Sequence, residues 1–360
     1  MTMPSVFSGF DAPDLWERLE NESRDILLYG MGNGADKILA VLSRRGIPVA
    51  GIFASDGFVR GHSFHGMPVR SFSEIEATYP PGGCVILPAF GSSRAEVLTL
   101  FDRVAARYEL LVPDVPVCGE TLFDRAFFTA HTEDFLAARG LFADEESRRI
   151  FDLVIRAKLT GSYETLMAAV SPADTAELLS LSTVTRAGDF GAYNGDTARE
   201  LIGAAPGLSY LLCAEPDPRS FKKLSEWAAT CERPQIDCRR AAVSDRAGAL
   251  AFDASGNRNA GAATGRATAT VSADTVDALF AGTPADYLKF DVEGSEAAAL
   301  LGSAGTIARF APRLKIACYH RAEDLFALPQ LAHRLCPSYR LYLRRARSVP
   351  AWDIDLLCRV

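Results

Sequence analysis

The sequence predicts an α/β protein with two parallel-sheet units joined by a helical segment. Apolar runs alternate with helical patterns over residues 24–118, the alternation stops over residues 119–184, and it resumes over residues 185–360. A chain of 360 residues is longer than one hydrophobic core usually organises, so more than one folded unit is expected. Strands that alternate with helices favour a mainly parallel sheet in each unit.

The first unit follows an N-terminal helical segment, residues 1–23. The apolar run 25–30 ends in Gly30, as a buried parallel strand does, and a glycine-rich turn and a helical pattern then run to Gly46. A strand over 48–54 ends at Ser55-Asp56. Further apolar runs predict strands at 84–88 and 110–113, on either side of a helix over 94–108. We therefore expect a small α/β unit over residues 24–118.

Residues 119–184 show helical periodicity without strand patterns and predict a helical connector. Asp144-Glu145-Glu146-Ser147 has the acids of a capped helix start, and Gly161 marks the end of that helix. Phe151, Val154, Ile155 and Leu159 recur on one face between these points. This face is expected to pack on one or both sheet units.

The second unit, residues 185–360, carries most of the predicted strands. They are expected at residues 182–188, 210–214, 238–243, 287–290, 314–319, 339–344 and 353–360. Only a short Arg- and Pro-containing turn separates the last two, so these should pair antiparallel. Residues 250–254 and 268–272 form a further possible hairpin around a Gly- and Ala-rich loop, residues 256–270. The result is a mainly parallel seven-stranded sheet that closes with an antiparallel hairpin.

Composition excludes several classes of protein. The net charge of −7, without a Lys/Arg block, argues against nucleic acid as a partner, since phosphate binding needs a basic face. Eight scattered cysteines without a C-x-x-C pair argue against a zinc site and a disulfide framework. The sequence shows no signal peptide and no run of about 18 apolar residues, so a cytoplasmic protein without a membrane span is expected. The oligomeric state is left open.

The sheet layout of the second unit is typical of Rossmann-like class I methyltransferases, whose cofactor is S-adenosylmethionine. Gly191 and Gly195 can let the turn after a strand approach the cofactor closely. Glu215 follows the next strand, about 20 residues on, where an acid accepts both ribose hydroxyls. Three further residues are expected to flank or bind the adenine: Ala242, Val243 and Asp245.

Three motifs together resemble the FkbM-type methyltransferase family over residues 185–360. They are Asp189-x-Gly-Ala-x-x-Gly-Asp-Thr, Ala214-Glu215-Pro216-Asp217-Pro218 and Lys289-Phe-Asp-Val-Glu-Gly-Ser-Glu296. The resemblance implies methyl transfer from S-adenosylmethionine, typically to hydroxyl oxygens of sugars or polyketide-like products. It also implies that the cofactor is bound by residues of the first two motifs: Asp189, Gly191, Ala192, Asn194, Gly195, Thr197 and Glu215. The segment Leu343-Arg344-Arg345-Ala346 has arginine where members of the family often have a histidine.

The acceptor is expected over the later strands, as a small molecule or saccharide whose hydroxyl loses a proton. Asp291 and Glu293 follow one central strand and His320 follows the next, so all three should lie at the ligand edge of the sheet. His320 is the expected base, although it can equally bond a loop carbonyl. The acids, with Glu296, can instead cap a helix, or hold a divalent ion if more ligands converge. We expect no metal.

A second glycine turn leaves an alternative function open. Gly30-x-Gly32-x-x-Ala35, with Asp56 about 20 residues on, fits the dinucleotide-binding fingerprint in its G-x-G-x-x-A form. The alternative is therefore an NAD(P)- or nucleotide-sugar-binding protein that uses the unit from Gly30 to Asp56. A non-catalytic relative of the fold is a third possibility. A packing role, or presentation of the substrate, is the preferred interpretation of the first unit.

Overall fold

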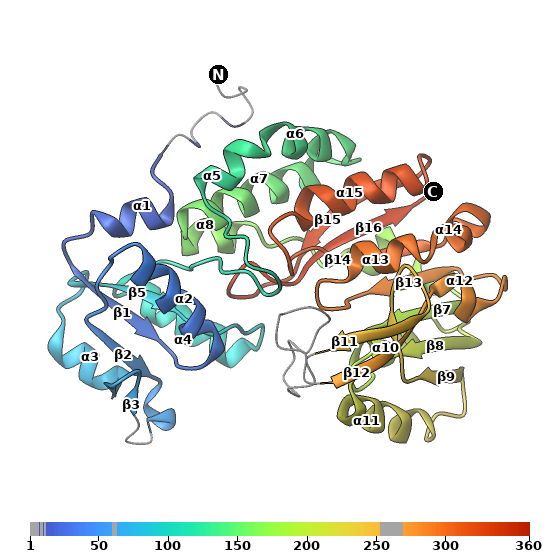
Figure 1. The fold of residues 1–360 in the computed structure, drawn as a ribbon, viewed down its shortest axis with the longest axis horizontal. Helices are drawn as coiled ribbons and strands as arrows, with labels where there is room; N and C mark the ends of the chain where they lie inside the picture. The colour runs from blue at the N-terminus through green and yellow to red at the C-terminus, as the bar shows by residue number, and fades with distance from the viewer. Residues whose placement is uncertain (1–6, 8–9, 11, 60–62, 253–268) are drawn as a thin grey trace.

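The computed structural model describes residues 7, 10, 12–59, 63–252 and 269–360. Within this part of the chain the strands form a six-stranded, a seven-stranded and a three-stranded sheet. The two larger sheets lie toward opposite ends of the molecule, and helices from the middle of the chain lie between them (Figure 1). The predicted α/β class is confirmed, with mostly parallel strands in both larger sheets.

The six-stranded sheet has the order β3-β4-β2-β1-β5-β6, and its pairs are parallel except for β3 with β4. Its strands are β1 (Asp25–Tyr29), β2 (Gly51–Ala54), β3 (Ser63–Phe64), β4 (Met67–Ser71), β5 (Cys84–Pro88) and β6 (Glu109–Leu110). The helices of this part are α1 (Leu15–Glu20), α2 (Asn33–Arg44), α3 (Phe72–Thr78) and α4 (Ala95–Ala105). The sequence patterns did not predict β3, β4 and α3.

Local chemistry accounts for the first of these elements. Asp14 begins α1 because its side chain accepts a hydrogen bond from the Glu17 backbone N–H, and Glu17 returns one to the Asp14 N–H. Strand β1 is buried beyond Asp25 because it lies between β2 and β5. Helix α2 turns its apolar face, which includes Ile38 and Leu42, into the core beside it.

Residues 119–184 form helices and no strand, as predicted. They are α5 (Arg125–Ala130), α6 (Thr132–Leu141), α7 (Glu145–Thr160), α8 (Tyr163–Ala168) and α9 (Thr175–Leu178). Asp144 caps α7 by accepting from the Ser147 N–H, and Gly161 ends the helix with a φ of 68°. Only glycine adopts this left-handed conformation without strain, so the predicted helix start and end are both confirmed.

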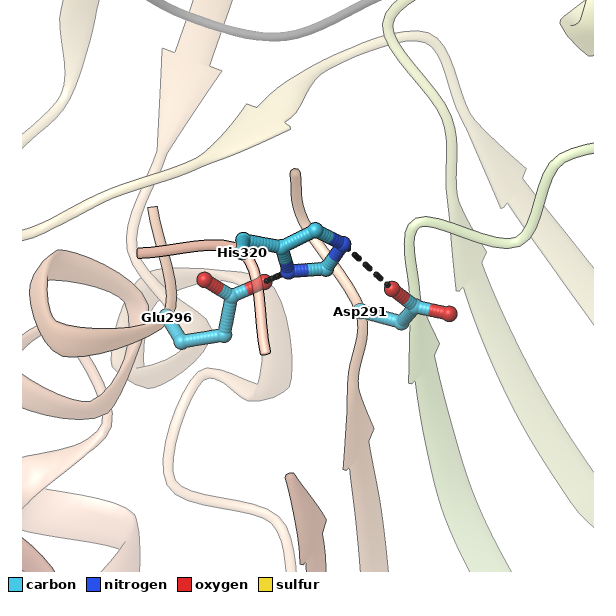
Figure 2. Close-up of side chains that lie close together, drawn as sticks. All are labelled: Asp291, Glu296 and His320. Atoms are coloured by element: carbon cyan, nitrogen blue, oxygen red, sulfur yellow. Dashed lines mark ion pairs between the residues drawn. The ribbon is translucent and has the colours of Figure 1, made fainter. Parts of the chain in front are cut away.

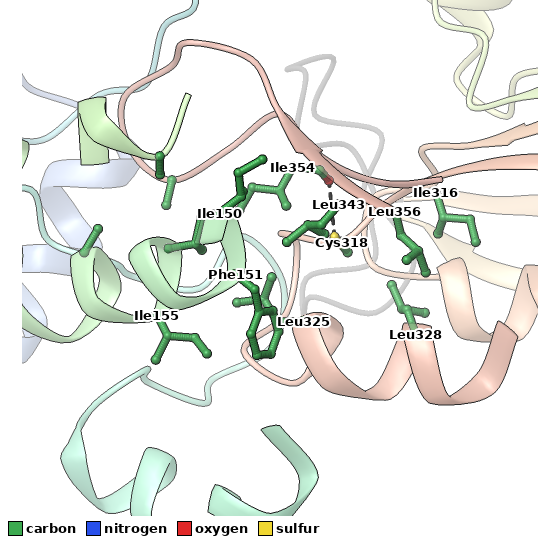
Figure 3. Close-up of a cluster of buried hydrophobic side chains, with 14 of the residues drawn as sticks. Ile150, Phe151, Ile155, Ile316, Cys318, Leu325, Leu328, Leu343, Ile354 and Leu356 are labelled. Atoms are coloured by element: carbon green, nitrogen blue, oxygen red, sulfur yellow. Dashed lines mark hydrogen bonds between the residues drawn. The ribbon is translucent and has the colours of Figure 1, made fainter. Parts of the chain in front are cut away.

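Helix α7 joins the two larger sheets through one continuous core. Ile150, Phe151 and Ile155 lie on its buried face, and Phe151 lies beside Leu325 of α15 (Asp324–Leu335) (Figure 3). The same buried cluster includes side chains of the six-stranded sheet. Burial of each large apolar side chain contributes about 1.5–3 kcal/mol, so this core holds the two sheets in a fixed relation.

The seven-stranded sheet has the order β15-β16-β14-β13-β7-β8-β9. Its strands are β7 (Arg186–Phe190), β8 (Tyr210–Ala214), β9 (Gln235–Arg239), β13 (Tyr287–Phe290), β14 (Arg313–Ala317), β15 (Arg340–Arg345) and β16 (Ile354–Arg359). Besides α15, its helices are α10 (Asp196–Ala204), α11 (Pro218–Ala228), α12 (Val276–Phe280), α13 (Glu296–Leu301) and α14 (Ala304–Phe310). The pairs β14–β16 and β15–β16 are antiparallel, which confirms the predicted hairpin.

In the second unit, two strand predictions were wrong in detail. The predicted strand 182–188 begins only at Arg186, because Leu181–Thr183 forms a 3₁₀ turn outside the sheet. The predicted strand 238–243 is divided between β9 and β10 (Ala242–Val243), which belong to different sheets.

Strand β10 lies in the three-stranded sheet beside β12 (Ala269–Asp274), which pairs antiparallel with β11 (Gly248–Phe252). The predicted hairpin is therefore present, although residues 253–268, with most of the predicted loop 256–270, lie outside the described residues.

Candidate functional site

A cavity of about 550 Å³ lies where the carboxyl ends of β7, β8, β13 and β14 meet. Open parallel sheets bind ligands at this edge, because the turns after neighbouring strands converge there. Among the predicted site residues, those that line the cavity are Gly191, Thr197, Glu215, Ala242, Val243, Asp291, Glu293 and His320.

The turn after β7 rests on a buried ion pair. Asp189 is 2% exposed, and one of its carboxylate oxygens accepts a hydrogen bond from the Thr197 hydroxyl at 2.7 Å. Its other oxygen lies 3.1 Å from Nζ of Lys289, which also donates to the Gly191 carbonyl at 3.0 Å. Asp189 therefore holds the turn in place from below, and it does not line the cavity.

Packing within the protein requires glycine at two positions of this turn. Gly191 and Gly195 have φ values of 77° and 83°, in the left-handed region. A Cβ on Gly191 would collide with the Asp291 carbonyl oxygen, and one on Gly195 would collide with the Trp227 ring. Close approach of neighbouring chain segments, rather than space for a ligand alone, therefore requires glycine at both positions.

Glu215 follows β8 and faces the cavity. Its two carboxylate oxygens accept hydrogen bonds from the Tyr193 and Asp217 backbone N–H groups, both at 2.8 Å. The side chain is fixed in this way, and burial raises the pKa of Glu215 to about 7. Each carboxylate oxygen has a further lone pair, so the group can still accept two more hydrogen bonds.

The remaining predicted cofactor residues lie in different surroundings. Ala242 and Val243 line the cavity from β10, outside the seven-stranded sheet to which the sequence assigned them. Asp245 is exposed and does not line the cavity. Ala192 is fully buried beneath the turn. The buried Oδ1 of Asn194 has no hydrogen-bond partner among the described residues.

His320 lines the cavity and lies among three carboxylates, of which Figure 2 shows Asp291 and Glu296 on opposite sides of the ring. Its Nε2 is 3.5 Å from Asp291 Oδ1 and 3.5 Å from Glu293 Oε2, and its Nδ1 is 3.0 Å from Glu296 Oε1. The imidazole is only 1% exposed. Glu293 has a φ of 52°, a strained conformation for a residue with a side chain. The predicted acceptor residues are thus close together, and Glu296 joins them.

Electrostatic effects in this cluster are large. Burial alone would lower the pKa of His320, but Glu296, Glu293 and Asp291 together raise it to about 10. Burial raises the pKa of Glu293 to about 8. Burial also acts to raise the pKa of Asp291, but the positive charges of Lys289 and His320 outweigh it and lower the pKa.

The six-stranded sheet also contributes to the cavity. Gly91, Ser92 and Ser93, which lie between β5 and α4, are among the lining residues. Ser92 pairs with Val349 through two backbone hydrogen bonds of 2.8 and 3.0 Å. Gly91 lies so close to the Trp352 ring that a Cβ would collide with it. The N-terminal part of the chain therefore closes one wall of the cavity.

The predicted dinucleotide turn lies away from this cavity. A Cβ on Gly30 would collide with the Phe90 ring, and one on Gly34 would collide with the Ala89 carbonyl oxygen. Asp56, the predicted ribose-binding acid, instead accepts hydrogen bonds from the Ser73 backbone and hydroxyl. Packing inside the first unit thus accounts for the glycines at Gly30 and Gly34.

The sequence patterns did not indicate some of the residues that form the site. Lys289 stood inside a quoted motif, but its apolar strand gave no sign that it pairs with Asp189. Lys315 and Asp355 line the cavity from neighbouring strands as an ion pair of 3.2 Å. Arg344, in contrast, is buried away from the cavity and binds Asp174 and Asp144. Neither Arg344 nor Arg345 lines the cavity, so both arginines of this segment act in packing.

Comparison with known proteins finds a family match in the second half of the chain and a similar solved structure for the whole chain. A family model described as the methyltransferase FkbM domain matches residues 189–346. The solved structure of a methyltransferase FkbM from Methylobacillus flagellatus KT is similar, with a TM-score of 0.69 and 18% identity. The match covers 99% of this chain and 94% of that chain. At this identity the likeness concerns the fold, and it includes the N-terminal sheet.

Other similarities are weaker. A precorrin-6y C5,15-methyltransferase from Geobacter metallireducens GS-15 has a TM-score of 0.33 and 9% identity, over 55% of this chain and 87% of that one. Aeropyrum pernix fibrillarin, solved with S-adenosyl-L-methionine, has a TM-score of 0.31 and 11% identity, over 49% and 66%. No curated protein matches the chain. Within the described residues, no helix has both the length and the apolar character needed to cross a bilayer. Residues 189–346 thus match the methyltransferase FkbM domain model, and the fold of the whole chain is similar to that of a solved methyltransferase FkbM.

Proposed function

We propose that this protein transfers a methyl group from S-adenosylmethionine to a hydroxyl of a saccharide or a related small polyhydroxylated metabolite. The observation that carries the proposal is that Glu215 and the cluster around His320 line the same cavity. Glu215 lines it after β8, and the His320 cluster lines it after β13 and β14. A donor and an acceptor bound over these two groups share one enclosed space, and such positioning supplies much of the rate of methyl transfer.

The residues on the Glu215 side fit the cofactor. The carboxylate is held by two backbone N–H groups and keeps free lone pairs for the ribose hydroxyls. Asn194, in the same turn, does not line the cavity, although its buried Oδ1 has no hydrogen-bond partner among the described residues. Ala242 and Val243 offer an apolar wall for the adenine. The bound cofactor supplies an electrophilic methyl group on a positively charged sulfur.

The charge of the cavity favours a neutral acceptor. Eight carboxylate residues line it, against two lysines and His320; the acids are Asp196, Glu200, Glu215, Asp217, Asp291, Glu293, Asp353 and Asp355. A phosphate- or carboxylate-bearing acceptor would be repelled by this surface, and so would a nucleic-acid backbone. Sugar hydroxyls, in contrast, donate hydrogen bonds to carboxylates. The acidic wall therefore supports an uncharged polyhydroxylated acceptor.

Asp291, Glu293 and His320 are the groups placed to assist the acceptor. In the transfer, an oxygen lone pair forms the new O–C bond while the C–S bond breaks and its electron pair stays on sulfur. The hydroxyl proton must pass to a base within hydrogen-bond reach. Among the described residues at this end of the cavity, the Asp291 carboxylate can accept this proton because the pKa of Asp291 is lowered. His320, whose pKa is raised to about 10, is already protonated and can only donate a hydrogen bond. Gly91 to Ser93 close the wall beside Trp352.

Isothermal titration calorimetry on the full chain tests the cofactor part of the proposal. We expect S-adenosylmethionine to bind, Glu215→Ala to weaken binding strongly, and NAD(H) to give no heat. Binding of NAD(H) without S-adenosylmethionine would instead support the oxidoreductase alternative. A screen of neutral sugars with a labelled methyl donor then tests the acceptor. Cofactor binding without transfer to any hydroxyl would favour the non-catalytic alternative.

A further inference from the structure

The loop between β15 and β16, residues 346–353, lines the cavity at the far end from Glu215. Glu215 follows β8, whereas this loop leads into β16. Strand β16 runs antiparallel to β14, so its start lies at the edge where β14 ends. Four strand spacings separate β8 from β16, which amounts to about 19 Å. The part of the cavity beside this loop therefore lies beyond the proposed cofactor position and is available to the acceptor.

Trp352 is the aromatic residue of this loop. It lines the cavity and is half-buried, and the edge of its six-membered ring rests against Gly91. Hydrogen bonds hold the backbone around it: the Trp352 carbonyl accepts one from the Ser348 hydroxyl at 2.8 Å, and Val349 pairs with Ser92. An indole fixed in this way loses little further conformational freedom when a ligand covers it, so it is suited to be a binding surface.

Asp353 follows Trp352 and also lines the cavity. Its φ of 52° lies in the left-handed region, and its carbonyl accepts a hydrogen bond from the Ala346 N–H at 3.0 Å, which closes the loop. Residues held in such sparsely populated conformations cost about 1–3 kcal/mol each and cluster at ligand sites. The loop thus presents an indole and a carboxylate side by side at one wall of the cavity.

An aromatic ring beside a carboxylate matches the chemistry of a sugar ring. The C–H groups on one face of a pyranose carry slight positive charge and pack on the negative face of an indole. Hydroxyls at the rim of the sugar ring donate hydrogen bonds to carboxylates, and hydrogen bonds to a charged acceptor are strong. An anionic ligand is disfavoured here, because Asp291 and Asp355 line the same cavity as Asp353.

We propose that Trp352 and Asp353 form a subsite that binds one uncharged sugar ring of the acceptor. The apolar face of the sugar lies on the indole, and a hydroxyl donates a hydrogen bond to the Asp353 carboxylate. The role of the subsite rests on the proposed function: it holds the acceptor so that a hydroxyl reaches Asp291, which follows β13, two strand spacings or about 10 Å from β16. The N-terminal unit contributes Gly91, which leaves room for the indole.

Saturation-transfer difference NMR on the full chain, with and without S-adenosylhomocysteine, tests the subsite. The probes are the methyl glycosides of glucose, galactose, mannose and xylose, and the linear polyol sorbitol is the control that has hydroxyls but no ring face. We expect at least one glycoside to bind, with saturation concentrated on the C–H groups of one face of its ring. Binding of none of the four glycosides, or equal saturation of sorbitol, would overturn the subsite.

Variants at the two positions assign the contacts. Trp352→Leu keeps an apolar side chain without an aromatic face and should weaken binding of the glycoside about tenfold, whereas Trp352→Phe should retain most of the affinity. Asp353→Asn removes the charge with a residue that tolerates the same backbone conformation, and it should also weaken binding about tenfold. Circular dichroism shows whether Trp352→Leu folds; Asp353→Asn provides the second variant.

Trp227→Leu is the matched control, because it makes the same change at a tryptophan outside the cavity. Trp227 packs against Gly195, and the Arg199 guanidinium lies over its ring. The glycoside affinity of this variant should equal that of the wild type. Unchanged affinity in Trp352→Leu and Asp353→Asn, or an equal loss in Trp227→Leu, would overturn the subsite.

Sugar binding and methyl transfer are measured separately, so their failures are distinguishable. Glycoside binding that depends on Trp352, in a chain that does not bind S-adenosylmethionine, would keep the subsite and overturn the proposed function. Methyl transfer to a sugar with the same KM in Trp352→Leu as in the wild type would overturn the subsite and leave the proposed function standing.

Discussion

Replacement of Lys289 with methionine tests whether one buried ion pair holds the turn after β7 in place. Lys289 and Asp189 have side chains 7% and 3% exposed, with 3.1 Å between Nζ and Oδ1. At an effective dielectric constant of about 20, two unit charges at this distance attract by about 5 kcal/mol. Removal of one partner leaves the other charge buried, which destabilises by about 3–5 kcal/mol. We expect Lys289→Met to lower the free energy of unfolding by this amount, although methionine has a similar volume.

Urea unfolding, monitored by far-UV circular dichroism, measures the loss. The control is the double variant Asp189→Asn/Lys289→Met, in which position 189 no longer carries an unpaired charge; Asp291, whose Oδ2 lies 3.8 Å from Lys289 Nζ, loses this neighbour in both variants. The double variant should recover part of the lost stability, and the double-mutant cycle gives the coupling between Asp189 and Lys289. A loss below about 1 kcal/mol in Lys289→Met, or a double variant no more stable than the single one, would refute the reasoning.

Three further predictions concern a carboxylate in the cavity, the N-terminal wall of the cavity and a buried arginine away from it. Burial raises the pKa of Glu215 to about 7, so its ionised fraction, and with it S-adenosylmethionine affinity by calorimetry, should fall about tenfold from pH 8 to pH 6. A flat profile would contradict a ribose-binding carboxylate, and Glu215→Gln should remove the dependence. In Gly91→Leu the new side chain collides with Trp352, and such overpacking usually costs about 1–3 kcal/mol. We expect the KM for the acceptor to rise about tenfold while the cofactor affinity stays unchanged. An unchanged KM would show that the N-terminal wall does not contribute to acceptor binding. Arg344→Met removes buried hydrogen bonds to Asp174 and Asp144. It should lower the free energy of unfolding, measured with urea, by about 2–3 kcal/mol without a change in KM. A changed KM would indicate that Arg344 acts in the site as well.

The fold was largely predictable because its signals are local. Apolar runs that end in glycine marked β1, and the acids before α7 with Gly161 after it marked both ends of that helix. Errors arose where the strand pattern was weak. The segment before β7 is polar because it forms a 3₁₀ turn, and β10 continues the chain of β9 into another sheet.

The candidate site was predictable only in part. Residues that follow strands were assigned to the cavity edge, since the topology of a parallel sheet fixes where its strands end. Lys289 was missed because its contact with Asp189 joins residues 100 positions apart, and no local pattern reports it.

By itself, the sequence determined the class of fold, the order of its elements and the family motifs, because periodicity and turn chemistry act over neighbouring residues. Only the tertiary structure decided where each motif residue lies and what it contacts. It placed Asp189 beneath the turn, closed the Gly30 turn with Phe90, and brought Gly91 against Trp352. It also placed the Glu296 carboxylate 3.0 Å from Nδ1 of His320. These relations depend on the packing of distant segments, which fixes distance and burial and therefore charge.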